Sequence, residues 1–158
     1  MRRLSYRQPT IDDVRLYFDW ANDAEVRKQS FSSNEIDFVN HCKWFISKIA
    51  DPNCMMLIFQ EVNKNKEVGQ IRITKQEEKS AVIGISVGSE FRGKGYAREM
   101  LMLASDLFLK NNPTFIIHAY IKKENFKSKK SFEGAGFIFN KMVVYEKFES
   151  FHYLKKQS

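Results

Sequence analysis

The sequence predicts an α+β domain whose sheet begins as an antiparallel meander. Three observations predict this class. Segments of alternating apolar residues recur along the chain, short polar turns join the first of them, and segments of helical periodicity precede and separate the others. A length of 158 residues is ordinary for one domain, and the chain contains no repeat, low-complexity segment or linker. We therefore expect residues 1–158 to form a single domain.

Two helices are predicted in the first third of the chain. Thr10 is a good N-cap, and Asp13 three residues later forms a short variant of the capping box. Apolar residues then recur at helical spacing, at Val14, Tyr17, Phe18 and Ala21. A second helix is predicted over residues 36–49, where one face carries Phe38, Cys42, Phe45 and Ile49.

From residue 55 the period changes to that of a β-strand. Three strands joined by short polar turns are predicted over residues 56–62, 67–74 and 81–87. A loop over residues 88–95 follows. Beyond it the pattern predicts a helix over residues 96–110, a strand over 115–121, a helix over 125–135 and a closing hairpin of residues 137–145 and 148–154.

The chain is basic, with 26 Lys and Arg residues against 19 Asp and Glu residues, a net charge of +7. Such an excess indicates either a solvated lysine-rich surface or an anionic partner such as nucleic acid, lipid or a phosphorylated small molecule. Cys42 and Cys54 form no metal-like cluster with the three histidines, so neither a disulfide framework nor a metal site is predicted. No apolar run approaches the ~20 residues of a membrane span, and we expect a soluble, cytoplasmic protein without a membrane partner.

The most informative segment is the loop that joins a strand to a helix, Arg92-Gly93-Lys94-Gly95-Tyr96-Ala97. Glycines let the backbone turn its N–H groups to one side, and a helix N-terminus adds unpaired donors, so such a loop suits a phosphate group. A dinucleotide-binding loop would need a third glycine at Arg98, and a Walker A loop would need Ser or Thr at Gly95. The remaining alternatives are a tight turn without a ligand and a different phosphate-binding family.

Two motifs favour such a family. Arg92-x-x-Gly95-x-Ala97 resembles the pyrophosphate loop of the GNAT superfamily of N-acetyltransferases. Asn125-x-x-Ser128-x-x-x-x-Glu133-x-x-Gly136-Phe137 resembles the helix that follows in the branch acting on nucleotide-linked amino sugars and on the N-termini of ribosomal proteins. The order and spacing of the motifs also resemble this family over nearly the whole chain.

The resemblance implies a mixed, mostly antiparallel sheet whose central strands, residues 81–87 and 115–121, splay apart and hold acetyl-CoA as acetyl donor. It implies pantetheine contacts near Ile85 and Val87 and a pyrophosphate on the loop. A lysine cluster (Lys122, Lys123, Lys127, Lys129 and Lys130) is either a solvated face or a contact for the 3′-phosphate. The expected donor-binding residues are Ile85, Ser86, Val87, Arg92, Gly93, Lys94, Gly95, Tyr96, Ala97, Asn125, Ser128 and Lys130.

Acetyl transfer needs a donor to the thioester oxyanion, an acid for the thiolate and a route for the amine proton. The resemblance implies that the Val87 N–H is the oxyanion donor. Many relatives carry a tyrosine as the acid where this chain has Phe132, so Ser128 becomes the candidate acid. His118 is the candidate base and shares one strand face with Tyr120. Water and positioning alone remain an alternative to any of these.

The acceptor side is expected in the N-terminal third and the meander, where the resemblance to the amino-sugar branch rests on Trp20, Asn22, Gln70 and Arg72. Together with Tyr120, these side chains offer stacking surfaces and hydrogen bonds for a sugar or nucleotide. For Trp20 and Trp44 a place in the core is the alternative. A nucleotide-linked amino sugar is therefore the expected acceptor, bound by a monomer or homodimer.

Two other function classes stay open at this point. One is an acetyltransferase for a protein N-terminus or a small amine. The other is a non-catalytic domain that binds acyl-CoA or RNA, but the interleaving of aromatic and basic residues that is typical of RNA binding is absent, so nucleic acid is not the expected partner.

Overall fold

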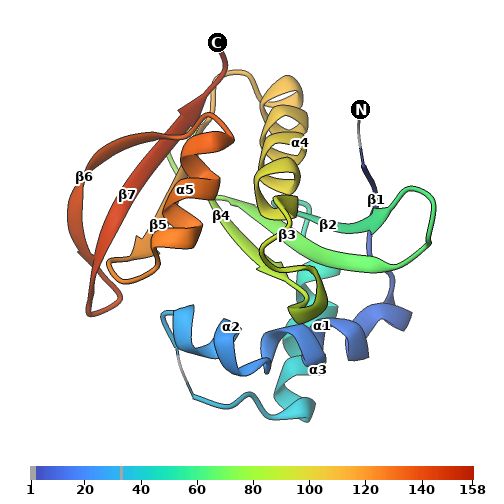
Figure 1. The fold of residues 1–158 in the computed structure, drawn as a ribbon. Coiled ribbons are helices and arrows are strands. Elements are labelled where there is room, and N and C mark those ends of the chain that lie inside the picture. Colours follow the sequence, from blue (N-terminus) through green and yellow to red (C-terminus); the bar gives the residue numbers. More distant parts are fainter. Residues whose placement is uncertain (1–2, 33) are drawn as a thin grey trace.

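The computed structural model describes residues 3–32 and 34–158, which form a seven-stranded sheet with helices on both faces (Figure 1). The strand order is β1-β2-β3-β4-β5-β7-β6. Only the β4–β5 pair is parallel. The strands are β1 (Leu4–Arg7), β2 (Cys54–Glu61), β3 (Glu67–Lys75), β4 (Ser80–Val87), β5 (Ile116–Lys122), β6 (Ile138–Tyr145) and β7 (Phe148–Lys156).

The helices divide between the two faces of the sheet. One face, here called the α4 face, is covered by α4 (Tyr96–Asn111) and α5 (Phe126–Gly134), and the main core lies beneath them. The other, the α1 face, is covered by α1 (Val14–Ala21) and α3 (Phe38–Ile49) over a smaller cluster of Tyr17, Phe45, Met56 and Ile58. Successive strand residues alternate between faces, so Leu57 belongs to the main core while its neighbours Met56 and Ile58 join the smaller one.

The two central strands separate soon after they begin. β4 and β5 pair at only three positions, from Ser80 opposite Ile116 to Val82 opposite His118. Beyond that point β4 stays paired with β3 as far as Val87, and β5 stays paired with β7 as far as Lys122. The sheet therefore opens into a V between β4 and β5 (Figure 1), which confirms the expected splay and the α+β class.

Two elements were not predicted, and both depend on distant partners. β1 has only four residues and pairs with β2, while the Leu4 N–H and the Arg3 side chain both bind Glu99 of α4. The short helix α2 (Ala24–Gln29) buries no residue. Asp23 caps α2 by accepting hydrogen bonds from the N–H groups of Glu25 and Val26.

The predicted helix start at Thr10 is confirmed, with the difference that a 3₁₀ turn (Ile11–Asp13) precedes α1. Asp13 accepts a 2.8 Å hydrogen bond from the Thr10 N–H and two 2.8 Å hydrogen bonds from the guanidinium of Arg7. The hydrogen bond from Arg7 holds the pKa of Asp13 below its usual value. This carboxylate therefore joins β1 to the start of α1.

Asp13→Asn is expected to lower the free energy of unfolding at pH 7 by about 1.5–3 kcal/mol, the usual contribution of a hydrogen bond to a charged group. Because the folded pKa is depressed, the contribution is present above the unfolded pKa near 4 and is lost as pH falls through the folded pKa. Urea unfolding at pH 7 and at pH 3 measures both statements. Asp12→Asn, on an exposed side chain of the same turn, is the control and is expected to change stability little. An equal loss in both variants, or a loss that does not shrink at low pH, would contradict the assignment.

Candidate functional site

The loop between β4 and α4 has the geometry of an anion cradle. Gly93 and Gly95 adopt φ values of +75° and +79°, which favour glycine, and α4 begins at Tyr96. The N–H groups of the first helical turn have no partner inside the helix. A Cβ placed on Gly93 would meet nothing within 4 Å. The loop backbone thus presents its donors beside open space.

Three side chains fix the conformation of this loop. Arg92 forms an ion pair with Asp23, the N-cap of α2. The Arg3 guanidinium donates a 2.9 Å hydrogen bond to the carbonyl oxygen of Lys94. Tyr96 is buried and donates a 2.6 Å hydrogen bond to Glu61. The side chains of Arg92 and Tyr96 are therefore engaged in contacts that shape the loop. The groups that these two residues keep available for a ligand are those of the main chain. Arg3 is a contributor that the sequence analysis missed, because only the fold brings it to residue 94.

The edge of β4 that faces the V carries unpaired backbone groups. Main-chain groups of successive strand residues point to opposite edges. The Gly88 N–H donates to the Val68 oxygen on β3, at 2.7 Å, so the main-chain groups of Val87 point the other way. Ile85 has the same parity as Val87, so its main-chain groups also point toward the V. Lys79 shares this parity, and its carbonyl accepts a hydrogen bond from the Ile116 N–H of β5, as the parity requires. Ile85 and Val87 therefore direct N–H and carbonyl groups into the V.

Ser86, between them, turns its main-chain groups to β3. Its hydroxyl lies on the α1 face and accepts a 3.1 Å hydrogen bond from the Gln70 amide. The Ser86 side chain thus lies on the α1 face, and a contact of Ser86 with the donor molecule stays a prediction.

The helix on the opposite side of the V begins at Asn125. The Asn125 side-chain oxygen caps α5 by accepting from the Ser128 N–H at 3.2 Å. No residue in the described part of the chain hydrogen-bonds to the Ser128 hydroxyl, whereas the Ser131 hydroxyl donates to the Lys127 carbonyl. Phe132 is buried and its ring packs edge-on against Phe137. The position of the usual tyrosine is therefore a core position here.

The lysine cluster divides into two groups. Lys122 is buried, donates to the Lys28 carbonyl at 3.1 Å and lies over the ring of Phe148 at 3.9 Å, so it does not belong to a phosphate-binding surface. Lys129 pairs with its helix neighbour Glu133. Lys130 is an exposed lysine of α5. The predicted contact with a 3′-phosphate therefore concerns the lysines of α5 and not Lys122, and it stays a prediction.

His118 and Tyr120 lie on the α1 face, as their strand parity predicted. His118 Nδ1 is 2.8 Å from His152 Nε2, and Tyr120 stacks on Tyr145 with ring centroids 3.9 Å apart. Burial lowers the pKa of both histidines. His118 pairs with Val82, five strand residues before Val87 and therefore roughly 16 Å from it. A base must come within hydrogen-bond reach of its proton, so the geometry does not support His118 as the base for chemistry at Val87.

The expected acceptor residues of the N-terminal third have mixed roles. Trp20 lies over the end of β4. Its Nε1 is 3.3 Å from the position that a Cβ atom would occupy if Gly88 carried one. The Asn22 amide binds the main chain of Ile36 on both sides, accepting from its N–H and donating to its carbonyl. Asn22 therefore fixes the segment after α2, and its expected contact with the substrate stays a prediction. Trp20 and Trp44 are both partly buried against the smaller core cluster.

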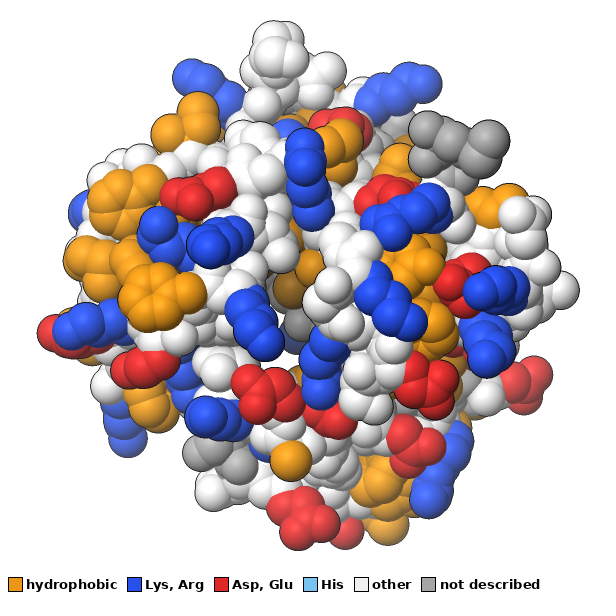
Figure 2. All heavy atoms as spheres, in the orientation of Figure 1, with side chains coloured by type: hydrophobic (Ala, Val, Ile, Leu, Met, Phe, Trp, Pro, Cys, Tyr) orange, Lys and Arg blue, Asp and Glu red, His pale blue; other side chains and the backbone are white. Residues whose placement is uncertain are grey.

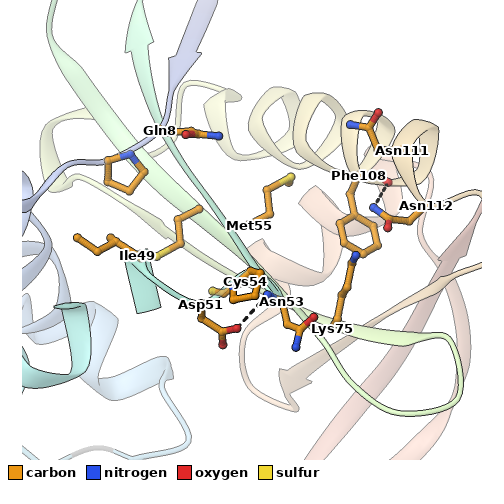
Figure 3. Close-up of a pocket in the computed structure, with 13 residues that line it drawn as sticks. Gln8, Ile49, Asp51, Asn53, Cys54, Met55, Lys75, Phe108, Asn111 and Asn112 are labelled. Carbon is orange, nitrogen blue, oxygen red and sulfur yellow. Dashed lines mark hydrogen bonds between the residues drawn. The ribbon is translucent and has the colours of Figure 1, made fainter. Parts of the chain in front are cut away.

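Two hollows lie at opposite ends of the meander formed by β2, β3 and β4. One, of about 450 Å³, borders Val87 between the C-terminal half of α1 and the loop, with Trp20 and Asp23 in its wall. The other, of about 380 Å³, lies where β2 begins and α4 ends, lined by Cys54, Lys75 and Phe108 (Figure 3). The second is far from the glycine loop, so it is not part of the site. Figure 2 shows that the molecule is hollowed near its centre and that Lys and Arg side chains border this hollow.

Residues 3–138 match the family model described as an acetyltransferase (GNAT) domain. The chain belongs to this GNAT family. The resemblance read from the two motifs is thereby confirmed at the level of the family, while the branch is not.

Solved structures of several other proteins share the fold. The chain superposes on aminoglycoside acetyltransferase AAC(6')-Ib in complex with ribostamycin and coenzyme A with a TM-score of 0.82 at 14% identity, covering 98% of this chain and 93% of that one. For Vibrio cholerae spermidine N-acetyltransferase in complex with CoA and spermine the TM-score is 0.82 at 19% identity, covering 96% and 94%. A domain from Methanocaldococcus jannaschii gives 0.82 at 24%, covering 97% of each chain.

A relative in sequence is the uncharacterized protein MJ1062 of Methanocaldococcus jannaschii, 28% identical over 137 residues. The match covers 85% of this chain but only 28% of that protein. The GNAT domain thus spans about a quarter of the length of the curated relative that it matches.

Two further findings concern the described part of this GNAT domain. Residues 3–32 and 34–158 contain no group of three or more His, Cys, Asp and Glu side chains arranged to hold a metal ion. Within the same ranges, none of the helices combines the length and the apolar character that a membrane crossing requires.

Proposed function

We propose that residues 1–158 form an acetyl-CoA-dependent N-acetyltransferase that acts on a primary amine. The observation that carries the proposal is the continuous row of main-chain donors along one side of the V. It starts at Ile85 and Val87 on β4 and ends on the glycine loop at the N-terminus of α4. An extended amide-bearing arm fits the strand edge, and a pyrophosphate fits the helix N-terminus. Acetyl-CoA combines the two, and it supplies the activated acetyl group.

In this proposal few residues of the chain take part in the acetyl-transfer step. The Val87 N–H, aimed into the V, holds the carbonyl oxygen of the thioester as it gains negative charge. The amine nitrogen forms a bond to the carbonyl carbon, the carbon–sulfur bond breaks and the thiolate leaves. Ser128 is the hydroxyl that we assign to protonate that thiolate, since Phe132 cannot do so and no described residue engages the Ser128 hydroxyl. His118 lies too far from Val87 to accept the amine proton, which passes to water, and Ser128 regains from water the proton that it gives to the thiolate.

For the acceptor we propose a nucleotide-linked amino sugar. Support comes from the α1 face. Gln70 and Arg72 lie there on β3, next to β4, Tyr120 lies on β5, and Trp20 lies over the end of β4. The structural neighbours support small amines as a class, since their names specify aminoglycosides and spermidine. Those two, and a protein N-terminus, are therefore the competing acceptors.

The test is release of the CoA thiol from acetyl-CoA with a panel of acceptors. The panel contains a UDP-linked 4-amino-6-deoxy sugar, a peptide with a basic N-terminus, spermidine and kanamycin. We expect release with the UDP-sugar, together with a product heavier by one acetyl group. Release only with another member would replace the sugar proposal by that acceptor. Calorimetric titration with CoA tests the donor site separately, and absence of CoA binding would overturn the acetyltransferase proposal.

A further inference from the structure

Arg72 differs from every other arginine in the described part of the chain. Each of the others makes at least one hydrogen bond or ion pair to a carboxylate or a main-chain carbonyl: Arg3, Arg7, Arg15, Arg27, Arg92 and Arg98. Within residues 3–32 and 34–158, Arg72 has neither; its guanidinium lies over the ring of Trp44, 5.0 Å from the centroid. Burial lowers its pKa, and no carboxylate acts on it. The Arg72 side chain is partly buried, and a cation partly withdrawn from water without a counter-charge is costly.

Other polar groups around this guanidinium are also unsatisfied. Among the described residues, Tyr17 Oη and Gln70 Oε1 are buried without a hydrogen-bond partner. The Tyr17 hydroxyl is close enough for Arg72 to influence its ionisation. Gln70 lies two residues before Arg72 on the same face of β3. Buried polar atoms are normally satisfied, so three neighbouring groups on one face indicate that a polar partner completes them.

The fold leaves room for that partner. Arg72 lies opposite Gly84 of β4, and a Cβ placed on Gly84 would meet only the guanidinium, at 3.7 Å. The same face of the sheet continues across the V with His118 and Lys122, while no Asp or Glu belongs to β4 or β5. The strands that border the V therefore present positive or neutral side chains on this face.

We infer that Arg72 binds an anionic group of the acceptor, a phosphate or a carboxylate, on the α1 face of the V. The inference rests on the proposed function, since it takes this face as the acceptor side. A guanidinium presents a planar pair of donors that matches either anion in a bidentate contact. The Tyr17 hydroxyl adds a further donor to the anion. Such a site selects amines that also carry negative charge, and it discriminates against polycations such as spermidine.

The experiment is calorimetric titration of the protein saturated with CoA, which fills the glycine loop. The probes are UDP for the phosphate source, β-alanine for the carboxylate source, and spermidine as the polycation. We expect at least one anionic probe to bind tenfold or more tightly than spermidine. Arg72→Gln is expected to weaken that binding at least tenfold, and Arg72→Lys, which keeps the charge without the planar fork, by an intermediate factor.

Arg15→Gln is the matched control, because Arg15 is exposed on α1, where it forms an ion pair with Asp19 and lies over the rings of Phe18 and Phe38. It is expected to bind each probe as the unmodified protein does. The affinity for CoA and the thermal midpoint of Arg72→Gln report whether the fold and the donor site are intact. Tighter binding of spermidine, binding of no anionic probe, or equal anion binding by Arg72→Gln would each overturn the inference. Loss of CoA binding by the unmodified protein would instead be a failure of the proposed function.

Discussion

Gly95→Ala is expected to raise the KM for acetyl-CoA 10- to 100-fold and to change kcat much less. Gly95 adopts φ +79°, and a residue with a Cβ pays about 1–2 kcal/mol there. Its Cβ would also lie 3.4 Å from the Arg3 guanidinium, which holds the carbonyl of Lys94. The loop relieves the strain by turning its peptides, so donors to the pyrophosphate are misdirected. Hydrogen bonds to a charged group contribute about 1.5–3 kcal/mol, which corresponds to that range of KM.

Gly136→Ala is the matched control for this variant. Gly136 also has a positive φ, +95°, and its Cβ would make only an ordinary contact with Lys155 at 3.5 Å. It follows the C-terminal end of α5, whereas the expected donor contacts are at the N-terminal end. Both variants are expected to lose similar stability in thermal unfolding, but only Gly95→Ala is expected to lose affinity for acetyl-CoA. If both variants had a similar KM for acetyl-CoA, the assignment of the glycine loop to the donor site would be wrong.

The elements that the sequence predicted well are those whose signal is local. The meander, α4, β5, α5 and the closing hairpin each have a clear period and a recognisable stop, such as the Asn112-Pro113 pair after α4. β1 and α2 have neither. β1 is a strand because Leu4 pairs with Glu61 and binds Glu99, and α2 is positioned through the ion pair of its cap with Arg92. Such contacts join residues that are 57 to 95 positions apart in the sequence. The spacing of apolar residues within one segment gives no information about them.

The same distinction applies to the site. The glycine loop, the helix start near Asn125 and the strand parity of His118 follow from local sequence, and the structure places them as expected. What local sequence did not indicate is the partner of each side chain. Asn22 binds the main chain of Ile36, and Lys122 turns inward toward Lys28. The position of His118 along the V depends on the register between β4 and β5, which is set by the whole sheet.

Gly69→Ala is expected to be among the most damaging single-methyl changes in the sheet. Gly69 lies on β3 opposite Val87, and a Cβ there would come within 2.3 Å of the Ser86 carbonyl oxygen. It would also lie 3.1 Å from the Cα of Val87 and 3.0 Å from the methyl group of Met100. The first two neighbours are backbone and cannot rotate away. Overpacking of this kind costs about 1–3 kcal/mol, and we expect the upper part of that range in urea unfolding.

Gly84→Ala, on the facing strand of the same ladder, is the control for stability. Its Cβ would meet only Arg72, at an ordinary contact distance, so the free energy of unfolding is expected to stay constant or to rise by up to about 1 kcal/mol. Because β3 must move away from β4 in Gly69→Ala, the direction of the Val87 N–H changes as well. The fraction that stays folded is therefore expected to show a kcat at least tenfold lower. If Gly69→Ala were as stable and as active as the unmodified protein, neither the close contact of β3 with β4 nor the role of Val87 would stand.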